Sequence, residues 1–206
     1  MKIIPKHIIE TLNKDGIYIC KGFLHKVTAE EIKKEAKLAI LNEEKYDYSF
    51  GDAVKLYGKC PQYPLINGLF DCELFNAIAD GWYDMPNKYE SSIITHEYKS
   101  DNMASNSFLH ADKNHALSVF LYLNDVDEDC GPFSYVPGSV GYGSRLRMSG
   151  YKNQLKQHKD LLYLKENVVD VIGPAGTLVI FSTDVIHMGG CVNNGERWAI
   201  RGHWRP

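Results

Sequence analysis

The sequence predicts a mainly β protein with flanking α-helices, whose antiparallel strands form a closed or sandwiched sheet. From residue 91 onward, short runs rich in Val, Ile, Phe, Tyr and Thr are separated by Gly, Pro, Asn and Asp, a pattern typical of strands and turns. The preceding residues show helical spacing, so we expect helices packed on the outside of the sheet. With 206 residues and no linker or internal repeat, the chain is expected to form one domain covering residues 1–206.

The amino-terminal part of the sequence predicts helices with one strand between them. Helices are expected over residues 5–13, 28–41 and 72–82, and a strand over residues 17–20. Gly16 can end the first helix, and Thr28 with Glu31 three residues later has the capping-box spacing that begins a helix. Within the second helix, Ile32 and Ala36 recur at helical intervals among lysines and glutamates, so one face should pack on the core.

The rest of the chain predicts a series of short strands. They cover residues 91–98, 116–123, 133–136, 168–172, 177–181 and 198–204. Residues 141–167 interrupt this pattern with a polar, partly helical stretch. We interpret this stretch either as a lid over the mouth of the barrel or as an inert surface insertion.

Composition and charge argue against several classes of partner. The formal net charge is -3 at pH 7 and no block of Lys or Arg is present, which argues against a surface that binds nucleic acid. The longest apolar run, residues 116–123, is far too short to cross a bilayer, and the amino-terminal residues lack the apolar core of a signal peptide. We therefore expect a cytoplasmic protein without membrane or nucleic-acid partners.

The cysteines predict neither a disulfide framework nor a metal site. The sequence contains 5 cysteines, an odd number, and they are widely spaced, so neither a closed disulfide set nor a CxxC pair is present. We expect reduced thiols that are mostly buried.

Two His-x-Asp triplets differ in their predicted backbone. His110 and Asp112 follow an extended segment, and residues i and i+2 of a strand project from the same face, close enough to share a metal ion. His158 and Asp160 lie in a stretch with helical character, where two residues advance by about 200° and the side chains diverge. We therefore expect the first triplet to bind a metal and the second to be solvated.

A second histidine is needed to complete a catalytic non-haem iron site. Such a site holds the metal with two imidazoles and one carboxylate on one octahedral face, and the other positions stay open for cosubstrate and oxygen. His187 follows the predicted strand 177–181 and precedes Gly189 and Gly190, where the backbone can turn at a barrel rim. Its position alone fits either the missing ligand or a structural histidine.

Several segments of the sequence resemble the phytanoyl-CoA dioxygenase family. They are residues 117–126, 130–132 (Cys-Gly-Pro), 136–139 (Val-Pro-Gly-Ser) and 173–181, the last continuing to His187, Gly190, Asn193 and Arg197. Residues 15–19 and 21–24 also match the opening of that family, so the resemblance extends over nearly the whole chain. It implies a double-stranded β-helix, which is a jelly roll of the cupin-like type.

The resemblance also implies a metal, a cosubstrate and the residues that bind them. The family's pattern assigns iron(II) to His110, Asp112 and His187, and it assigns the distal carboxylate of 2-oxoglutarate to Arg197. It implies an enzyme that uses oxygen, hydroxylates a small-molecule substrate and releases succinate and carbon dioxide. Asp112 favours hydroxylation, because related halogenases replace this carboxylate with a small residue to make room for chloride.

Four further residues are candidates for contacts with the cosubstrate or the substrate. Phe120 falls where an aromatic ring often lies beside the cosubstrate, and Ser107 could offer it a hydroxyl; a core ring and an ordinary strand hydroxyl are the alternatives. Arg145 and Arg147 follow the Pro-Gly-Ser turn near the expected barrel mouth. One of these arginines is a candidate to pair with a negatively charged substrate group, and the alternative is that both are surface arginines.

Two other functions remain compatible with the sequence. One is a cupin-like metal enzyme that does not use 2-oxoglutarate, and the other is a non-catalytic β-barrel that binds a metal or a small ligand. Arg197 is the feature that distinguishes a 2-oxoglutarate enzyme from the cupin-like metal enzyme, and succinate release would separate all three functions. Arg201 should point to the same face of the terminal strand, but four residues span about 13 Å, so the two arginines should not serve one carboxylate equally. The sequence leaves open the substrate, the oligomeric state and whether the reaction is a hydroxylation, a desaturation or a cyclisation.

Overall fold

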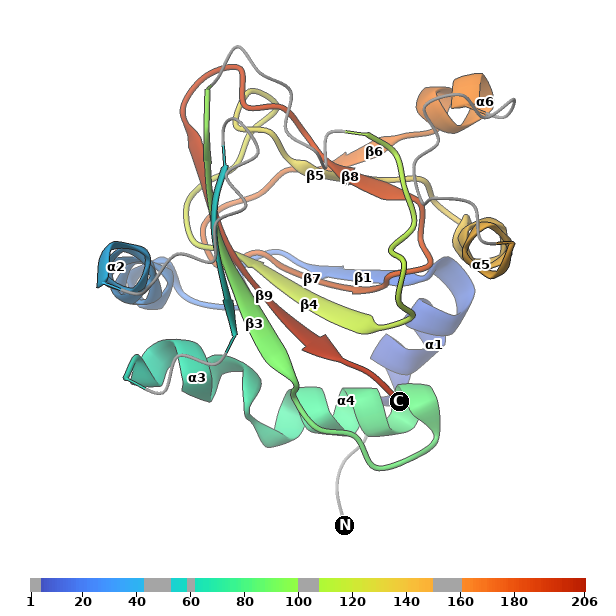
Figure 1. Cartoon of the computed structure of the whole chain (residues 1–206), viewed down its shortest axis with the longest axis horizontal. Coiled ribbons are helices and arrows are strands. Elements are labelled where there is room, and N and C mark those ends of the chain that lie inside the picture. Colours follow the sequence, from blue (N-terminus) through green and yellow to red (C-terminus); the bar gives the residue numbers. More distant parts are fainter. Residues whose placement is uncertain (1–4, 43–52, 59–61, 100–107, 150–160) are drawn as a thin grey trace.

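The computed structural model describes residues 5–42, 53–58, 62–99, 108–149 and 161–206. Two sheets face each other across the interior (Figure 1), and the paired strands in both are antiparallel. The larger sheet has the order β1 (Ile17–Cys20), β7 (Leu178–Ser182), β4 (Leu117–Tyr122), β9 (Glu196–Trp204), β3 (Ser91–Tyr98) and β2 (Ala53–Gly58). The smaller sheet has the order β6 (Val169–Val171), β5 (Phe133–Tyr135) and β8 (His187–Gly189). The predicted mainly β fold is confirmed.

Helices cover the outer face of the larger sheet and lie beside the smaller one. The first four are α1 (Lys6–Asp15), α2 (Lys26–Asn42), α3 (Pro64–Phe70) and α4 (Glu73–Tyr83). Their apolar side chains share a core cluster with the larger sheet, and Figure 1 shows α3 and α4 along its outer face. The other two, α5 (Val140–Met148) and α6 (Leu161–Glu166), lie beside the smaller sheet. The helices predicted to pack outside the sheet therefore do so.

Strand β4 separates two apolar cores, which explains why its sequence is apolar at every position except Ser118. Leu117, Val119 and Leu121 point to the core between the larger sheet and the helices. Phe120 and Tyr122 point to the core between the two sheets. Because side chains alternate along a strand, a strand buried on both faces has a nearly continuous apolar run.

The two sheets are joined by a tyrosine hydroxyl as well as by apolar contacts. Tyr122 lies on β4 and is completely buried. Its hydroxyl donates to the carbonyl of Val171 at 2.7 Å and accepts the N–H of Phe133 at 2.8 Å. These partners belong to β6 and β5, so one buried side chain of the larger sheet satisfies two backbone groups of the smaller sheet.

The predicted capping box of the second helix is wrong. Helix α2 begins at Lys26, so Thr28 lies inside its first turn rather than at its cap. The N–H of Ala29 bonds to the carbonyl of His25 at 3.1 Å, and Nδ1 of His25 accepts the N–H of Val27 at 3.4 Å. The histidine therefore takes the position that Thr28 was expected to have. The other predicted helices agree with α1 and α4 within a few residues, and Gly16 ends α1 in the left-handed conformation with φ 75°.

Three short elements and the burial of the cysteines differ from expectation. Helix α3 and strands β2 and β8 were not predicted, and they are only 7, 6 and 3 residues long. A periodic pattern has too few positions to repeat within such lengths.

The expectation of mostly buried thiols is wrong for the four cysteines that the structure describes. Cys191 is exposed, and the other three are partly buried and unpaired: Cys20, Cys72 and Cys130.

Residues 141–167 contribute α5 and α6, and residues 150–160 lie outside the described part of the chain. The proposal that this stretch is a lid, and the proposal of a single domain over residues 1–206, therefore stay predictions. Among the helices described, none combines the length and the apolar character that crossing a membrane requires.

Candidate metal centre and adjoining pocket

Backbone pairing brings the two candidate histidine ligands together from distant parts of the chain. His110 and His187 form an isolated antiparallel bridge. The N–H of His110 bonds to the carbonyl of His187 at 2.9 Å, and the N–H of His187 bonds to the carbonyl of His110 at 2.8 Å. Two residues further on, the N–H of Asp112 bonds to the carbonyl of Thr183 at 2.9 Å. The segment that carries His110 and Asp112 is thus held against both ends of the turn between β7 and β8.

Both imidazoles are oriented by the same local contact. Nδ1 of His110 lies 2.6 Å from the carbonyl of Phe108, and Nδ1 of His187 lies 2.7 Å from the carbonyl of Val185. A carbonyl only accepts, so Nδ1 carries the proton and Nε2 of each ring keeps its lone pair. Histidines that bind metals characteristically donate their other ring N–H in this way.

The free Nε2 atoms converge on one carboxylate. Oδ1 of Asp112 lies 3.7 Å from Nε2 of His110 and 3.8 Å from Nε2 of His187. The three candidate ligand atoms all lie within 4.8 Å of one another. Two imidazoles and one carboxylate are the donor set of the facial triad that holds non-haem iron(II). The arrangement can therefore hold one divalent ion and leave part of its coordination sphere open to the pocket.

The electrostatics of the three side chains suit a metal ion. Burial lowers the pKa of His187 to about 4, so its ring is neutral at pH 7 and Nε2 can bind a metal. Desolvation raises the pKa of Asp112, but Coulombic interactions with His187 in its protonated form and with Arg201 outweigh it, and the pKa lies below its usual range. Nε2 of His187 is buried and has no hydrogen-bond partner among the described residues. A buried lone pair without a partner costs about 1–3 kcal/mol, and a bound metal would remove that cost.

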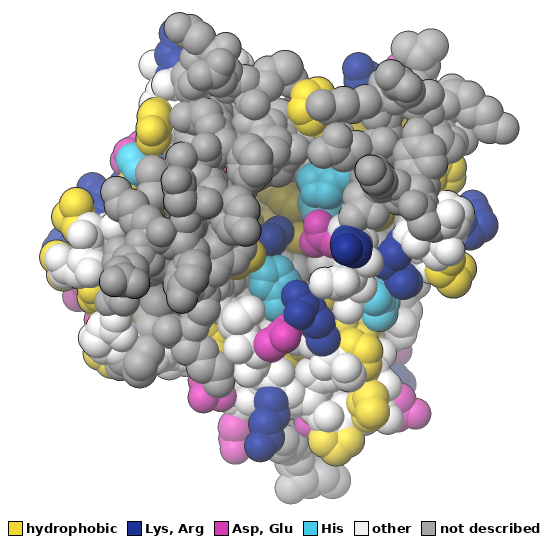
Figure 2. Space-filling model, viewed as in Figure 1, with side chains coloured by type: hydrophobic (Ala, Val, Ile, Leu, Met, Phe, Trp, Pro, Cys, Tyr) yellow, Lys and Arg dark blue, Asp and Glu magenta, His cyan; other side chains and the backbone are white. Residues whose placement is uncertain are grey.

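A pocket opens from the metal centre between the two sheets. It is lined by Ile93, Thr95, Glu97, His110, Phe120, Phe133, His187, Gly189, Arg197 and Arg201. On the face drawn in Figure 2, histidine, acidic and basic side chains gather around a central hollow. Phe120 lines this pocket and also belongs to the core between the two sheets, so its contact with the cosubstrate stays a prediction. Ser107 falls outside the described residues. The triplet of His158 and Asp160 also falls outside them.

Arg197 is buried in this pocket and only partly satisfied. Its side chain is 3% exposed, and Nη2 donates to the carboxylate of Glu97, the residue directly opposite on β3. Nε and Nη1 are buried without a partner among the described residues. A guanidinium with free donors at the back of a pocket is suited to a ligand carboxylate. The geometry is therefore compatible with the distal carboxylate of 2-oxoglutarate.

Glu97 is a pocket residue that the sequence analysis missed. It is 4% exposed and lies in β3, where Ile93, Thr95 and Glu97 share the pocket face. The alternation of β3 places it on the same face as Ile93, but this face also carries polar residues, so the strand pattern gave no signal that Glu97 is buried. Its partner Arg197 lies 100 residues away, so only the pairing of β3 with β9 reveals the ion pair.

The two arginines predicted near the substrate lie outside this pocket. Arg147 is committed to Asp184, with Nε and Nη2 at 2.7 and 3.2 Å from its carboxylate oxygens. Asp184 also accepts from Nδ1 of His115 at 3.0 Å, and these contacts lower the pKa of Asp184 to about 2 although desolvation raises it. Arg145 is exposed on α5. Neither arginine lines the pocket of the metal centre.

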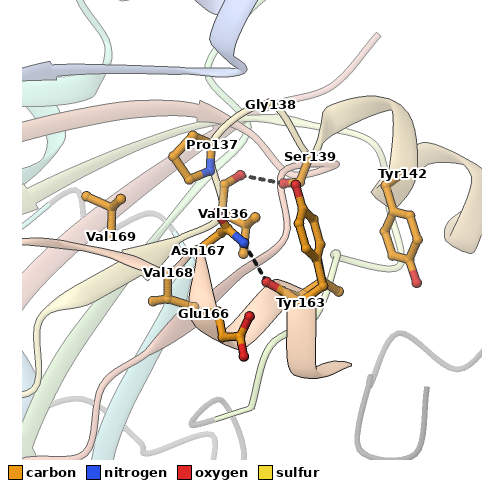
Figure 3. Close-up of a pocket in the computed structure, with 11 residues that line it drawn as sticks. Val136, Pro137, Gly138, Ser139, Tyr142, Tyr163, Glu166, Asn167, Val168 and Val169 are labelled. Carbon is orange, nitrogen blue, oxygen red and sulfur yellow. Dashed lines mark hydrogen bonds between the residues drawn. The ribbon is translucent and has the colours of Figure 1, made fainter. Parts of the chain in front are cut away.

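A second pocket lies between the start of α5 and helix α6 (Figure 3). It is lined by Val136, Pro137, Gly138, Ser139, Tyr142, Tyr163, Leu164, Glu166, Asn167, Val168 and Val169. The hydroxyl of Ser139 donates to the carbonyl of Val136 at 2.7 Å, as Figure 3 shows, and accepts the N–H of Ile186 at 2.8 Å. Ile186 precedes His187, so this hydrogen bond links the Pro-Gly-Ser turn to the backbone next to a candidate metal ligand.

Replacing Ser139 with alanine is expected to lower the free energy of unfolding by about 1–3 kcal/mol, because the buried N–H of Ile186 loses its acceptor. Ser149→Ala is the matched control, since its hydroxyl donates to Leu146 at an exposed helix end. The control should change stability by less than about 0.5 kcal/mol. Urea unfolding followed by fluorescence measures both values, and equal stabilities of the two variants would contradict the supporting role of Ser139.

Comparison with solved structures confirms the class of fold. SnoN, an epimerase from nogalamycin biosynthesis solved with Fe3+, alpha ketoglutarate and nogalamycin RO, matches with a TM-score of 0.74 and 15% identity over 97% of this chain and 82% of that one. HygX from Streptomyces hygroscopicus, with nickel and 2-oxoglutarate, matches with a TM-score of 0.70 and 14% identity over 98% and 87%. EctD from S. alaskensis, with bound Fe, matches with a TM-score of 0.73 and 14% identity over 99% and 77%.

The facing sheets therefore form the double-stranded β-helix shared with these iron and 2-oxoglutarate proteins, as predicted. The model of the phytanoyl-CoA dioxygenase family matches residues 100–198, so the resemblance to that family predicted from the sequence is confirmed over this segment. The matched segment contains all three candidate metal ligands and Arg197. The resemblance noted at residues 15–24 lies outside the match. No curated protein sequence matches the chain.

Proposed function

We propose that the protein is an iron(II)- and 2-oxoglutarate-dependent dioxygenase that hydroxylates a small-molecule substrate. The observation that carries this proposal is the convergence of unsatisfied groups in one pocket. Nε2 of His187 faces the carboxylate of Asp112 beside Nε2 of His110, and buried donors of Arg197 are free further along the same pocket. A metal ion and a dicarboxylate would satisfy both sets at once.

The residues of the chain bind and orient the reactants. His110, Asp112 and His187 would hold iron(II), and Arg197 would bind the distal carboxylate of 2-oxoglutarate. When both are bound, they supply the oxidation chemistry, in which oxygen converts 2-oxoglutarate to succinate and carbon dioxide and a hydroxyl group enters the substrate. Asp112 keeps a carboxylate in the metal set, which favours hydroxylation.

Aromatic packing would keep the metal side of the pocket dry. The rings of Phe133 and Phe181 lie 5.5 and 5.0 Å from the ring of His187, centroid to centroid. Phe120 lies 5.7 Å from Phe133 on the pocket wall. These rings shield the imidazole from water, which strengthens electrostatic interactions at the centre and limits side reactions.

Relatives of the same fold support a small-molecule substrate. The SnoN structure contains nogalamycin RO, and a HygX structure contains hygromycin B. The identities are only 15%, so these ligands indicate the kind of substrate that the fold accommodates rather than a particular compound.

A second candidate function is favoured by Glu97. Its carboxylate already pairs with Arg197, which in a 2-oxoglutarate enzyme is expected to meet the cosubstrate instead. In a cupin-like metal enzyme that does not bind 2-oxoglutarate, Arg197 would serve only as the ion-pair partner of Glu97. The two free donors of Arg197 are the reason to prefer the 2-oxoglutarate enzyme.

Adding 2-oxoglutarate to the iron(II)-loaded protein without oxygen is expected to produce a metal-to-ligand charge-transfer band. Admitting oxygen should then release succinate, at least by uncoupled turnover, and omission of iron should abolish it. Iron-loaded protein that shows neither the band nor succinate would favour the cupin-like metal enzyme. Failure to bind iron as well would favour a non-catalytic β-barrel.

A further inference from the structure

Arg201 is the second arginine of the pocket. It lies on β9 opposite Ile93 of β3 and Phe120 of β4, and all three residues line the pocket of the metal centre. Arg197 faces the same pocket from the same strand, four residues earlier. That separation corresponds to about 13 Å along a strand, so the two guanidinium groups serve different parts of the pocket.

Arg201 differs from its neighbours in having no partner within the described part of the chain. Arg197 pairs with Glu97, and Arg205 just beyond the strand pairs with Glu90 at 2.9 Å. No hydrogen bond or ion pair joins Arg201 to a described residue, although its side chain is partly buried. A partly buried guanidinium that lines a pocket and has no counterion among the described residues is suited to bind an anion.

Arg201 lies close to the candidate metal centre. The pocket that His110 and His187 line is also lined by Arg201. Asp112 does not approach it within ion-pair distance, and its carboxylate is already assigned to the metal. An anion bound to Arg201 would therefore lie next to the metal, where a substrate must lie to react.

The surroundings of Arg201 favour a carboxylate over a more highly charged group. His203 is the next residue on the same face of β9, and burial together with the charge of Arg201 lowers its pKa to about 3. Its ring is therefore neutral at pH 7 and adds no second positive charge. Three other residues of the pocket wall are apolar, namely Ile93, Phe120 and Phe133, and the acidic residue Glu97 in the same lining is paired with Arg197. The planar guanidinium of one arginine can donate two parallel hydrogen bonds to one carboxylate, whereas binding of a phosphate dianion requires more positive charge.

We propose that Arg201 binds the carboxylate of the substrate and that the enzyme therefore acts on small carboxylic acids with an apolar body. This inference rests on the proposed function, because it takes the metal centre as the place of reaction. The sequence suggested Arg145 or Arg147 as the partner of a negatively charged substrate group. Arg201 takes this role in the present proposal, because it lines the pocket and they do not.

The test uses acetate and acetamide, which have nearly the same shape and differ in charge. The full-length protein is loaded with manganese(II), which is paramagnetic, and saturated with 2-oxoglutarate. Broadening of the methyl proton signal of each probe then measures its binding near the metal. Wild-type protein should bind acetate roughly tenfold to a hundredfold more tightly than acetamide, the range expected for a charge-assisted hydrogen bond. Arg201→Gln should bring this ratio to about one.

Two further variants separate the role of Arg201 from general effects of charge. Arg205→Gln removes an exposed arginine at the end of the same strand and should leave the acetate preference unchanged. Arg201→Lys keeps the charge but loses the planar fork, so its preference should be intermediate. Circular dichroism confirms that each variant is folded before it is compared.

Equal binding of the two probes to the wild type, or a preference that persists in Arg201→Gln, would overturn the assignment. A loss of 2-oxoglutarate affinity in Arg201→Gln with the acetate preference intact would also overturn it, because Arg201 would then serve the cosubstrate. A wild type that fails to bind 2-oxoglutarate would count against the proposed function alone. The acetate preference is then measured with manganese(II) only.

Discussion

Asp112→Ala and His187→Ala are each expected to lose metal binding and turnover, because either change leaves only two protein ligands. Removing a group that merely orients a ligand typically lowers metal affinity by roughly 10- to 100-fold, so removal of a ligand should cost at least about 100-fold. Asp112→Asn is the milder variant, since it keeps the shape of the side chain and removes the charge that faces the metal. Competition with a coloured chelator under anaerobic conditions measures the iron(II) affinity of each variant.

His158→Ala is the matched control, because His158 belongs to the other His-x-Asp triplet of the sequence. It should keep both iron affinity and succinate release. His187 is 3% exposed, so its replacement also creates a cavity, and thermal unfolding must show that the variant is folded. Retained iron affinity in the Asp112 and His187 variants, or its loss in His158→Ala, would show that the wrong triplet had been chosen.

The parts of the fold that the sequence predicts are those with a long, regular pattern. Strand β3 has the predicted boundaries, and the apolar run at residues 116–123 marks β4, whose two faces are buried in different cores. Strand β8 has only three residues, and its position follows from pairing with β5 rather than from its own composition. Local periodicity could therefore not reveal it.

The sequence predicts those features of the candidate site that depend on the spacing of residues along one segment. It does not predict those that depend on the pairing of distant strands. The positions of His110 and Asp112 on one extended segment follow from the alternation of side chains. Their approach to His187 requires a backbone bridge between distant segments, for which the family pattern supplied the only sequence signal. The ion pair of Glu97 with Arg197 depends on the register of β3 and β9, so the sequence analysis did not find it.

Arg197→Leu is expected to raise the dissociation constant of 2-oxoglutarate by roughly one to three orders of magnitude, while iron(II) binding persists. The physical reason is that the buried donors Nε and Nη1 offer the distal carboxylate a charged, planar partner that leucine lacks. Arg201→Leu should change this constant much less, because it lies about 13 Å further along the strand. Anaerobic titration of the iron-loaded variants, followed by the charge-transfer band, gives the constants.

Glu97 requires a further variant for this experiment to be decisive. Arg197→Leu alone removes the guanidinium that pairs with the buried carboxylate of Glu97, and breaking a buried ion pair from one side can cost about 3–5 kcal/mol. The double variant Glu97→Gln/Arg197→Leu removes both charges and should recover most of that stability. It should not recover affinity for 2-oxoglutarate, because the lost interaction is with the cosubstrate and not with Glu97. The opposite result would be normal 2-oxoglutarate affinity in the double variant together with strongly reduced affinity in Arg201→Leu. It would show that Arg201 binds the cosubstrate and that the ion pair of Glu97 with Arg197 has only a structural role.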